Sequence, residues 1–202
     1  MDSITLPIAA IVHDHEDEAD QLLQGLVADL RRQGLDVRGL AMVKHGAGHG
    51  RVRRCLQDVH TGERFLIFQD LGAGSQACCL DITRLAAASG VLRAAIQARP
   101  ALAVVNRFGR QEASGGGFVQ EILGLIEADI PVLTIVAGEF LADWRRFTGG
   151  LGEELPASEP GLRAWAGRWT GSSPRCGRCR SWGVWRGAAA DRRALCVGRC
   201  GL

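Results

Sequence analysis

The sequence predicts a three-layer α/β fold, in which a mainly parallel sheet lies between two layers of helices and carries a β-hairpin insertion. Two observations lead to this prediction. Four runs rich in apolar and β-branched residues recur along the chain, at residues 4–12, 36–43, 101–105 and 131–137. Amphipathic segments with helical spacing separate these runs. Buried parallel strands form such continuous apolar runs, and strands that alternate with helices join one sheet through right-handed crossovers.

The beginning of the chain predicts a strand followed by a helix. The first strand covers Ile4 to Val12, and the first helix covers Gln21 to Arg32, where leucines and a valine recur on one face. Gly34 is placed to end that helix. We expect residues 13–20 to connect the two elements as an acidic loop with five carboxylates, no Gly and no Lys.

The middle of the chain predicts a hairpin and a long helix. Alternating apolar and polar residues, with a Gly-containing turn between them, favour the hairpin. The long helix can be capped by Asp81 or Thr83. The elements expected here are a strand at 36–43, hairpin strands at 52–59 and 64–69, and a helix that ends near residue 98.

The next segment returns to the strand–helix alternation. The apolar run after Pro100 is short enough for a buried strand, and Pro131 opens another. The elements expected here are a strand at 101–105, a glycine-rich loop at 107–116, a helix at 118–128, a strand at 131–137 and a helix at 139–147.

Length and composition suit one α/β domain with an appendage. The chain has 202 residues, of which 47% are hydrophobic, and 7 Cys. It holds no apolar run long enough to cross a membrane, and Met1 to Ala10 lacks the basic start of a signal peptide. We therefore expect a cytoplasmic protein without membrane insertion, whose cysteines are thiols or metal ligands.

The charge distribution divides the chain after residue 159. Residues 1–159 carry a net charge of −6 and residues 160–202 a net charge of +8. The second segment also holds four of the five Trp and shows little hydrophobic periodicity. We expect a domain at 1–159 and a basic tail at 160–202 that is disordered or translated from GC-rich DNA in a shifted frame. Any contact of this tail with nucleic acid would be nonspecific.

A zinc module is the alternative for this tail. Cys176 and Cys179 form one close pair, and Cys196 and Cys200 form another. Four thiolates at this spacing can complete a tetrahedral site, although the second pair is one residue wider than in the usual zinc ribbon.

Asn106 is placed where a parallel sheet binds its ligands, because it directly follows the strand at 101–105. A P-loop nucleotidase carries an Asp at this point to hold magnesium, often followed by a catalytic Glu. Asn106 and Arg107 stand there instead. The 13–20 connection also lacks the GxxxxGK[ST] pattern that cradles phosphates.

Several long strings resemble an uncharacterised bacterial domain family whose genes commonly lie beside molybdate-transport genes. The strings are IAAIVHD, RRQGLDVRGL, DLGAGSQACCLD, VVNRFGRQEASGGG, IPVLTIV and FLADWRRFTGGL, within residues 5–155. The layout is more remotely similar to thermophilic-type nucleoside-triphosphatases, whose DEIGxME string aligns on residues 106–112. Gly109 and Glu112 match there, but both Walker B carboxylates and the Walker A loop are missing. The resemblance implies a P-loop-like (Rossmann-like) fold without the hydrolytic apparatus and a link to molybdenum.

Two loops are candidate ligand sites. The loop at 106–117 offers the amide of Asn106, the guanidinium groups of Arg107 and Arg110, Gly109 and the carboxylate of Glu112, before three glycines lead into a helix. The loop at 70–81 offers Gly72 and Gly74 for an N–H nest, together with Ser75, Cys79 and Asp81. The alternative is that both are ordinary connecting loops with solvated charges and buried cysteines.

These observations support two hypotheses of function. In the first, the protein is a non-hydrolytic binding or regulatory protein for an oxyanion such as molybdate or for a nucleotide-like ligand, and its partners are molybdenum transport or cofactor proteins. In the second, it is an enzyme of molybdenum cofactor supply that uses Glu112, Asp81 or Cys79, or a degenerate nucleoside-triphosphatase. A divalent-metal site formed by four histidines, at positions 13, 15, 45 and 49, is a weaker alternative to solvent-exposed loop residues.

Overall fold

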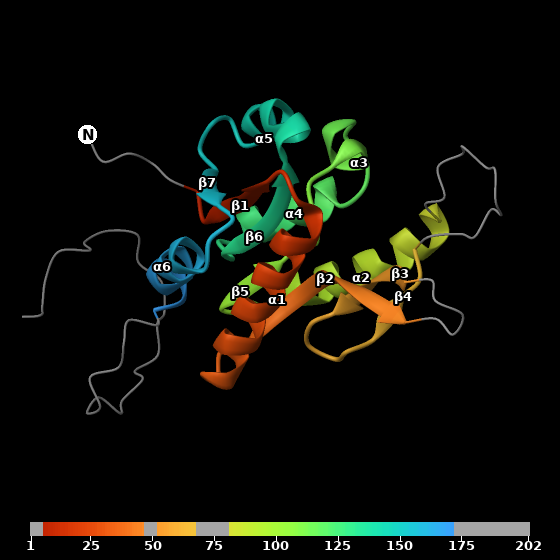
Figure 1. Cartoon of the computed structure of the whole chain (residues 1–202), viewed down its shortest axis with the longest axis horizontal. Coiled ribbons are helices and arrows are strands. Elements are labelled where there is room, and N and C mark those ends of the chain that lie inside the picture. The colour runs from red at the N-terminus through yellow and green to blue at the C-terminus, as the bar shows by residue number, and fades with distance from the viewer. Residues whose placement is uncertain (1–5, 47–51, 68–80, 172–202) are drawn as a thin grey trace, which may run out of the picture.

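A seven-stranded sheet with helices on both faces forms the protein (Figure 1). The computed structural model describes residues 6–46, 52–67 and 81–171. The elements are β1 (Ile8–His13), α1 (Glu16–Arg32), β2 (Val37–Gly46), β3 (Val52–Asp58), β4 (Arg64–Phe65), α2 (Ile82–Ala98), β5 (Leu102–Val104), α3 (Arg110–Ala113), α4 (Val119–Glu127), β6 (Val132–Ala137), a 3-10 turn η1 (Gly138–Phe140), α5 (Leu141–Phe147), β7 (Glu153–Pro156) and α6 (Glu159–Thr170).

The sheet is mainly parallel, as the sequence predicts. Its strand order is β4-β3-β2-β5-β6-β1-β7. Neighbouring strands among β2, β5, β6, β1 and β7 pair in parallel, whereas β3 and β4 add an antiparallel hairpin at one edge. β5 lies at the centre of the order, and its three residues are fully buried. The prediction of a central strand within residues 101–105 is therefore confirmed.

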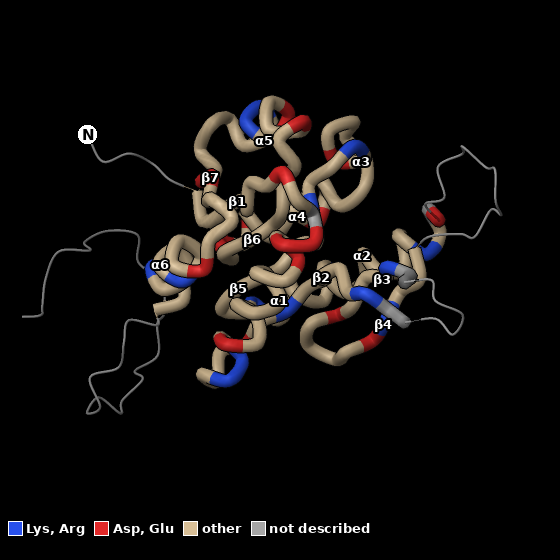
Figure 2. The backbone as a smooth tube through the Cα atoms, viewed as in Figure 1, with Lys and Arg blue, Asp and Glu red and all other residues tan. Residues whose placement is uncertain are grey.

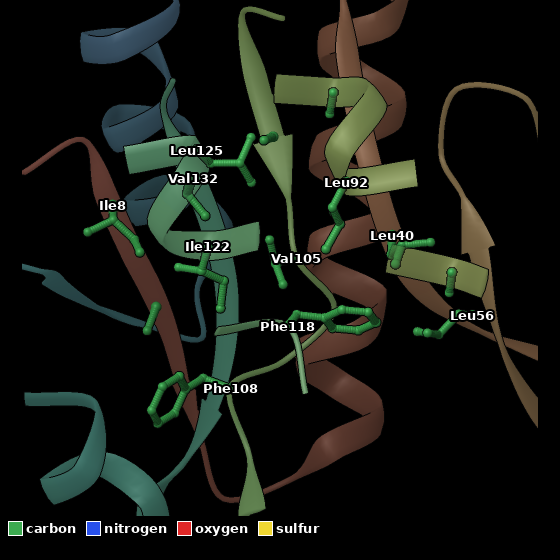
Figure 3. Close-up of a cluster of buried hydrophobic side chains, with 14 of the residues drawn as sticks. Ile8, Leu40, Leu56, Leu92, Val105, Phe108, Phe118, Ile122, Leu125 and Val132 are labelled. Carbon is green, nitrogen blue, oxygen red and sulfur yellow. The ribbon is translucent and has the colours of Figure 1, made fainter. Parts of the chain in front are cut away.

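Each face of the sheet packs against its own pair of helices, because alternate side chains of a strand point to opposite faces. In β1, Ile8 and Ala10 belong to the core under α2 and α4, whereas Ala9 and Ile11 belong to the core under α1 and α6. Figure 3 shows the first of these cores, in which Val132 of β6 lies near Leu125 of α4 and Val105 lies near Leu92 of α2. The resulting three-layer arrangement confirms the predicted fold class.

α1 begins five residues earlier than the sequence suggested. Residues 16–20 were expected in an acidic loop, but they form the first turn of this helix. Carboxylates near a helix N-terminus interact favourably with the helix dipole, so an acidic stretch is compatible with a helix start. The connection from β1 to α1 is consequently only Asp14 and His15.

α6 extends the domain beyond the expected boundary after residue 159. Leu162, Trp165 and Ala166 are each 1% exposed and pack into the same core as the inner face of α1. Figure 1 shows α6 beside the sheet at the β7 edge. Residues 160–170 therefore belong to the domain and not to the expected tail. Residues 172–202, which include the four cysteines of the zinc alternative, lie outside the described residues.

None of the helices in the described part of the chain has the length and apolar content needed to cross a membrane.

Candidate functional site

The candidate site lies where the central strands end. β5, β6 and β1 are neighbouring parallel strands, so their carboxyl ends meet at one edge of the sheet. The segment 105–118 leaves β5 at this edge and contains α3 before it enters α4. Phe108 anchors the segment, because its backbone pairs with Val136 and its ring packs edge-on against Trp144, with 5.5 Å between ring centroids.

Asn106 is a buried polar residue at this edge. Only 4% of the residue is exposed, and its Oδ1 atom has no hydrogen-bond partner among the described residues. Burying an amide without a partner costs on the order of 1–3 kcal/mol, and such a group in a native protein indicates strain, a functional role, or a bound water or ion. A turn of the amide about its terminal bond would present an N–H₂ donor at the same point. Asn106 is therefore where the sequence places it and is suited to receive a ligand.

Arg107 holds the segment to the beginning of α1. Its guanidinium donates to both carboxylate oxygens of Asp20, at 3.1 and 3.4 Å. The Asp20 side chain is only 10% exposed, which shields this ion pair from water. The pair joins residues 87 positions apart in the sequence and places a cation at the end of the central strand.

Glu112 has a structural contact on each carboxylate oxygen. Its Oε2 accepts the backbone N–H of Gly109 at 3.0 Å, and its Oε1 accepts the backbone N–H of Phe118 at 3.1 Å. The side chain thus closes the start of α3 and ties it to the start of α4. The amides that the sequence offered to an external anion are, at these two positions, already paired with this carboxylate.

Arg110 is the exposed cation of the segment. It is the first residue of α3, and within the described residues its guanidinium makes no hydrogen bond or ion pair. A hollow of about 190 Å³ between α3, α4 and α5 is lined by Phe108, Ala113 and Phe147 among others. This volume is below the range of roughly 300–1,000 Å³ that is typical of drug-sized ligand pockets.

The second predicted loop is largely outside the described residues. Gly72, Gly74, Ser75 and Cys79 all fall within residues 68–80, which the structure does not describe. Asp81 is described, and its side chain accepts the backbone N–H of Arg84 at 3.1 Å as the N-cap of α2. Of the two predicted caps, Asp81 and Thr83, Asp81 is the one that caps this helix.

The structure also brings together charges that the sequence did not connect. Asp17, in the first turn of α1, accepts Nζ of Lys44 at 2.9 Å and the guanidinium of Arg54 at 2.9 Å. The hydrogen bond from Lys44 is the largest cause of a lowered pKa at this carboxyl, and the nearby Arg54 lowers the pKa further. Figure 2 shows the acidic start of α1 at the sheet edge. A hairpin between β2 and β3 pairs Lys44 with Arg54. That hairpin was not predicted from the sequence, and this cluster was therefore missed.

Comparison with known proteins places the chain in a family. The family model described as "Protein of unknown function (DUF2478)" matches residues 8–165, which covers the sheet and most of α6. The chain belongs to the DUF2478 family. The match supports the assignment of α6 to the domain, because it continues beyond residue 159.

One curated relative has a name from molybdenum import. The chain is 38% identical over 175 residues to the "Molybdenum import ATP-binding protein ModC 2" of Bradyrhizobium diazoefficiens. The match covers 86% of the chain but only 19% of the relative, so the chain spans about one-fifth of that protein. No solved structure gives a significant match.

Proposed function

We propose that this domain is a non-hydrolytic binding or regulatory module of molybdenum uptake, and that its ligand is a tetrahedral oxyanion such as molybdate. The observation that carries the proposal is the buried Asn106 amide at the carboxyl end of the central strand, whose Oδ1 has no partner within the part of the chain that the structure describes. The preceding strand is completely buried, so this amide is held in a fixed position.

The cations around Asn106 favour an anion. Arg107 follows Asn106 in the sequence and is paired with Asp20, and Arg110 of the same segment is exposed. An arginine guanidinium presents paired N–H donors that match the oxygens of a tetrahedral oxyanion. Among tetrahedral oxyanions we choose molybdate because the name of the curated relative refers to molybdenum import. A cytoplasmic location and partners among molybdenum transport or cofactor proteins belong to the same proposal.

A nucleotide is the weaker candidate ligand. A phosphate-cradling loop spans about eight residues between strand and helix, whereas Asp14 and His15 alone connect β1 to α1. The first turn of α1 carries Asp17, Glu18 and Asp20, which repel a triphosphate. The two carboxyl groups considered for catalysis, Glu112 and Asp81, both accept backbone N–H groups.

Binding of molybdate tests the proposal directly. We expect the purified chain to bind molybdate with a dissociation constant below ~1 mM, which corresponds to about 4 kcal/mol. Arg110→Gln should weaken binding by about tenfold or more, because it removes a charge-assisted hydrogen bond. Arg32→Gln is the matched control, since Arg32 is also exposed but lies at the far end of α1. Isothermal titration with molybdate, tungstate, sulfate and ATP measures both effects. If none of these anions binds more tightly than ~1 mM, the proposal is wrong.

We expect ATP and GTP hydrolysis at the rate of buffer alone. Phosphoryl transfer depends on positioned cations and on magnesium held by carboxylates, and Asn106 replaces the carboxylate at the end of the central strand. Phosphate release with magnesium measures the rate. A magnesium-dependent rate that is abolished by Glu112→Gln in a correctly folded protein would show that the protein is an enzyme.

A further inference from the structure

A groove with a volume of about 350 Å³ lies between α1 and α6. Leucines of both helices form its apolar part, and among them Leu26 and Leu162 are buried. Gly25 of α1 also lines it and leaves room for an occupant, because a Cβ atom added at Gly25 would meet no atom within 4 Å. We refer to this feature as the α1–α6 groove.

The α1–α6 groove is acidic. Its charged lining consists of three carboxylates and one guanidinium group, which belong to Glu18, Asp29, Glu159 and Arg163. Arg163 pairs with Asp29 and Glu159, and Arg32 pairs with Asp29 from outside the lining. Glu18 is exposed and has no ion pair within the described residues. Even with Arg32 included, carboxylates outnumber guanidinium groups by three to two. The groove therefore favours an occupant that combines apolar side chains with positive charge.

The chain carries such a segment shortly after α6. Residues 172–202 follow Gly171 and contain seven Arg and one Asp, which gives a net charge of +6. Within them, residues 180–186 have the sequence RSWGVWR, in which two Trp and a Val stand between two Arg. Trp and Arg are among the residue types that most often dominate the binding energy of an interface. This short sequence therefore matches the groove in both apolar character and charge.

The connection to α6 is long enough for this segment to reach the groove. The α6 residues that line the groove lie between Glu159 and Arg163, which is eight to twelve residues before Gly171. At the rise of an α-helix, this is a distance of about 12–18 Å along the axis. Residues 172–179 can span up to about 26 Å when extended. The segment can therefore return along α6 to the groove.

We propose that residues 180–186 bind in the α1–α6 groove of their own chain, with a Trp ring against the buried leucines and the flanking arginines at the carboxylates. Because the segment is tethered to α6, its effective concentration at the groove is on the order of millimolar. Contacts that are weak between separate molecules are then sufficient. The inference uses neither Asn106 nor Arg110, so it is independent of the proposed function.

A disulfide between the groove and the segment tests this placement in the full chain. Cys179 directly precedes the segment, and Gly25→Cys adds a thiol in the groove. Cys55 is buried and is kept. The remaining cysteines are replaced by Ser, and these are Cys78, Cys79, Cys176, Cys196 and Cys200. Under mild oxidation by air, we expect the new thiol to pair with Cys179 of the same chain at least about tenfold faster than a thiol elsewhere on the surface, as tethered proximity implies.

Gly90→Cys in the same background is the matched control. Gly90 is also a helical glycine with open space around its Cβ position, but it belongs to α2, which covers the opposite face of the sheet. Gln21→Cys provides a second, exposed thiol position in the groove, so the test does not depend on one variant. Mass spectrometry of proteolytic peptides identifies each disulfide, and thermal melting verifies that each variant is folded.

Two changes show which forces hold the segment. Replacement of both Trp182 and Trp185 by Ala should lower the pairing of Gly25→Cys to the rate of Gly90→Cys, because it removes the apolar anchors. Added salt should slow the pairing of Gly25→Cys more than that of Gly90→Cys, because exposed charges are screened.

The outcomes decide the inference. Preferred pairing of Gly25→Cys and Gln21→Cys with Cys179 of the same chain, lost when both tryptophans are replaced, supports it. Equal pairing at the groove and at Gly90→Cys overturns it, as does the absence of any disulfide. Pairing that persists without the two tryptophans shows that residues 180–186 are not the occupant. Disulfides formed only between two chains overturn the placement within one chain and assign the groove to a second copy.

Discussion

A chain that ends at residue 158 is expected to lose its cooperative fold, whereas a chain that ends at residue 171 keeps it. The shorter chain lacks α6 and with it Leu162, Trp165 and Ala166, which are almost completely buried. Truncation of a buried Trp alone costs about 3–5 kcal/mol, and a buried Leu about 2–5 kcal/mol. Their sum approaches the roughly 5–15 kcal/mol by which a whole domain is stable.

Thermal unfolding followed by circular dichroism measures this difference. The chain ending at 171 is the matched control, because it retains every residue that the structure describes. Trp165→Ala in the full chain isolates the largest contact and should lower the melting temperature by about 6–20 °C, from its cost and the roughly 2–4 °C per kcal/mol typical of chains of this size. A 158-residue chain that melts within about 5 °C of the 171-residue chain would contradict the assignment of α6 to the core.

Replacement of Glu112 by Ala is expected to destabilise the domain by about 3 kcal/mol. The carboxylate is buried and accepts the backbone N–H groups of Gly109 and Phe118. Loss of a charged acceptor costs on the order of 1–3 kcal/mol for each buried donor left without a partner. The melting temperature should therefore fall by roughly 6–12 °C.

Two comparisons make this prediction specific. Glu127→Ala removes a carboxylate from the exposed end of α4 and should change stability by less than about 0.5 kcal/mol. Gly117→Ala should act like the loss of Glu112, because a Cβ atom at Gly117, where φ is +58°, would overlap the Glu112 carboxylate. If Glu112→Ala has the same melting temperature as the natural protein, the two hydrogen bonds do not stabilise the segment. A direct contact of Glu112 with the ligand would then be the better explanation of this residue.

The strands β1 and β6 could be predicted from sequence because they are apolar runs, whereas β7, which contains Glu153 and Glu154, was not predicted. Ile8 to His13 and Val132 to Ala137 are buried on both faces, so nearly every residue carries the signal. α6 was missed because the average composition after residue 159 is basic and rich in Gly and Trp. Its helical signal is nevertheless present, since Leu162, Trp165, Ala166 and Trp169 recur at helical spacing and Gly171 ends the helix.

The sequence could predict where the candidate site lies but not which contacts its charged side chains make. The change from apolar to polar residues placed Asn106 at the edge of the sheet, and the structure confirms it there. The partners of the charges could not be predicted, because Arg107 meets Asp20 and Arg54 meets Asp17 across long separations in the sequence. Glu112 was considered a ligand or an acid–base group because a sequence shows a carboxylate but not the amides that it faces.

The two-residue turn between β1 and α1 also determines which changes could give this domain nucleotide chemistry. Asn106→Asp is a single substitution and would return a carboxylate to the end of β5. The phosphate loop has no equivalent substitution, because about six further residues would have to be inserted between Asp14 and Glu16 to reach the length of such a loop. That insertion would also move the first turn of α1 away from Lys44 and Arg107, which it now contacts. A library of point substitutions should therefore yield no ATPase from this scaffold. A library of insertions at residue 15 can instead lengthen the β1–α1 connection to that of a phosphate-binding loop.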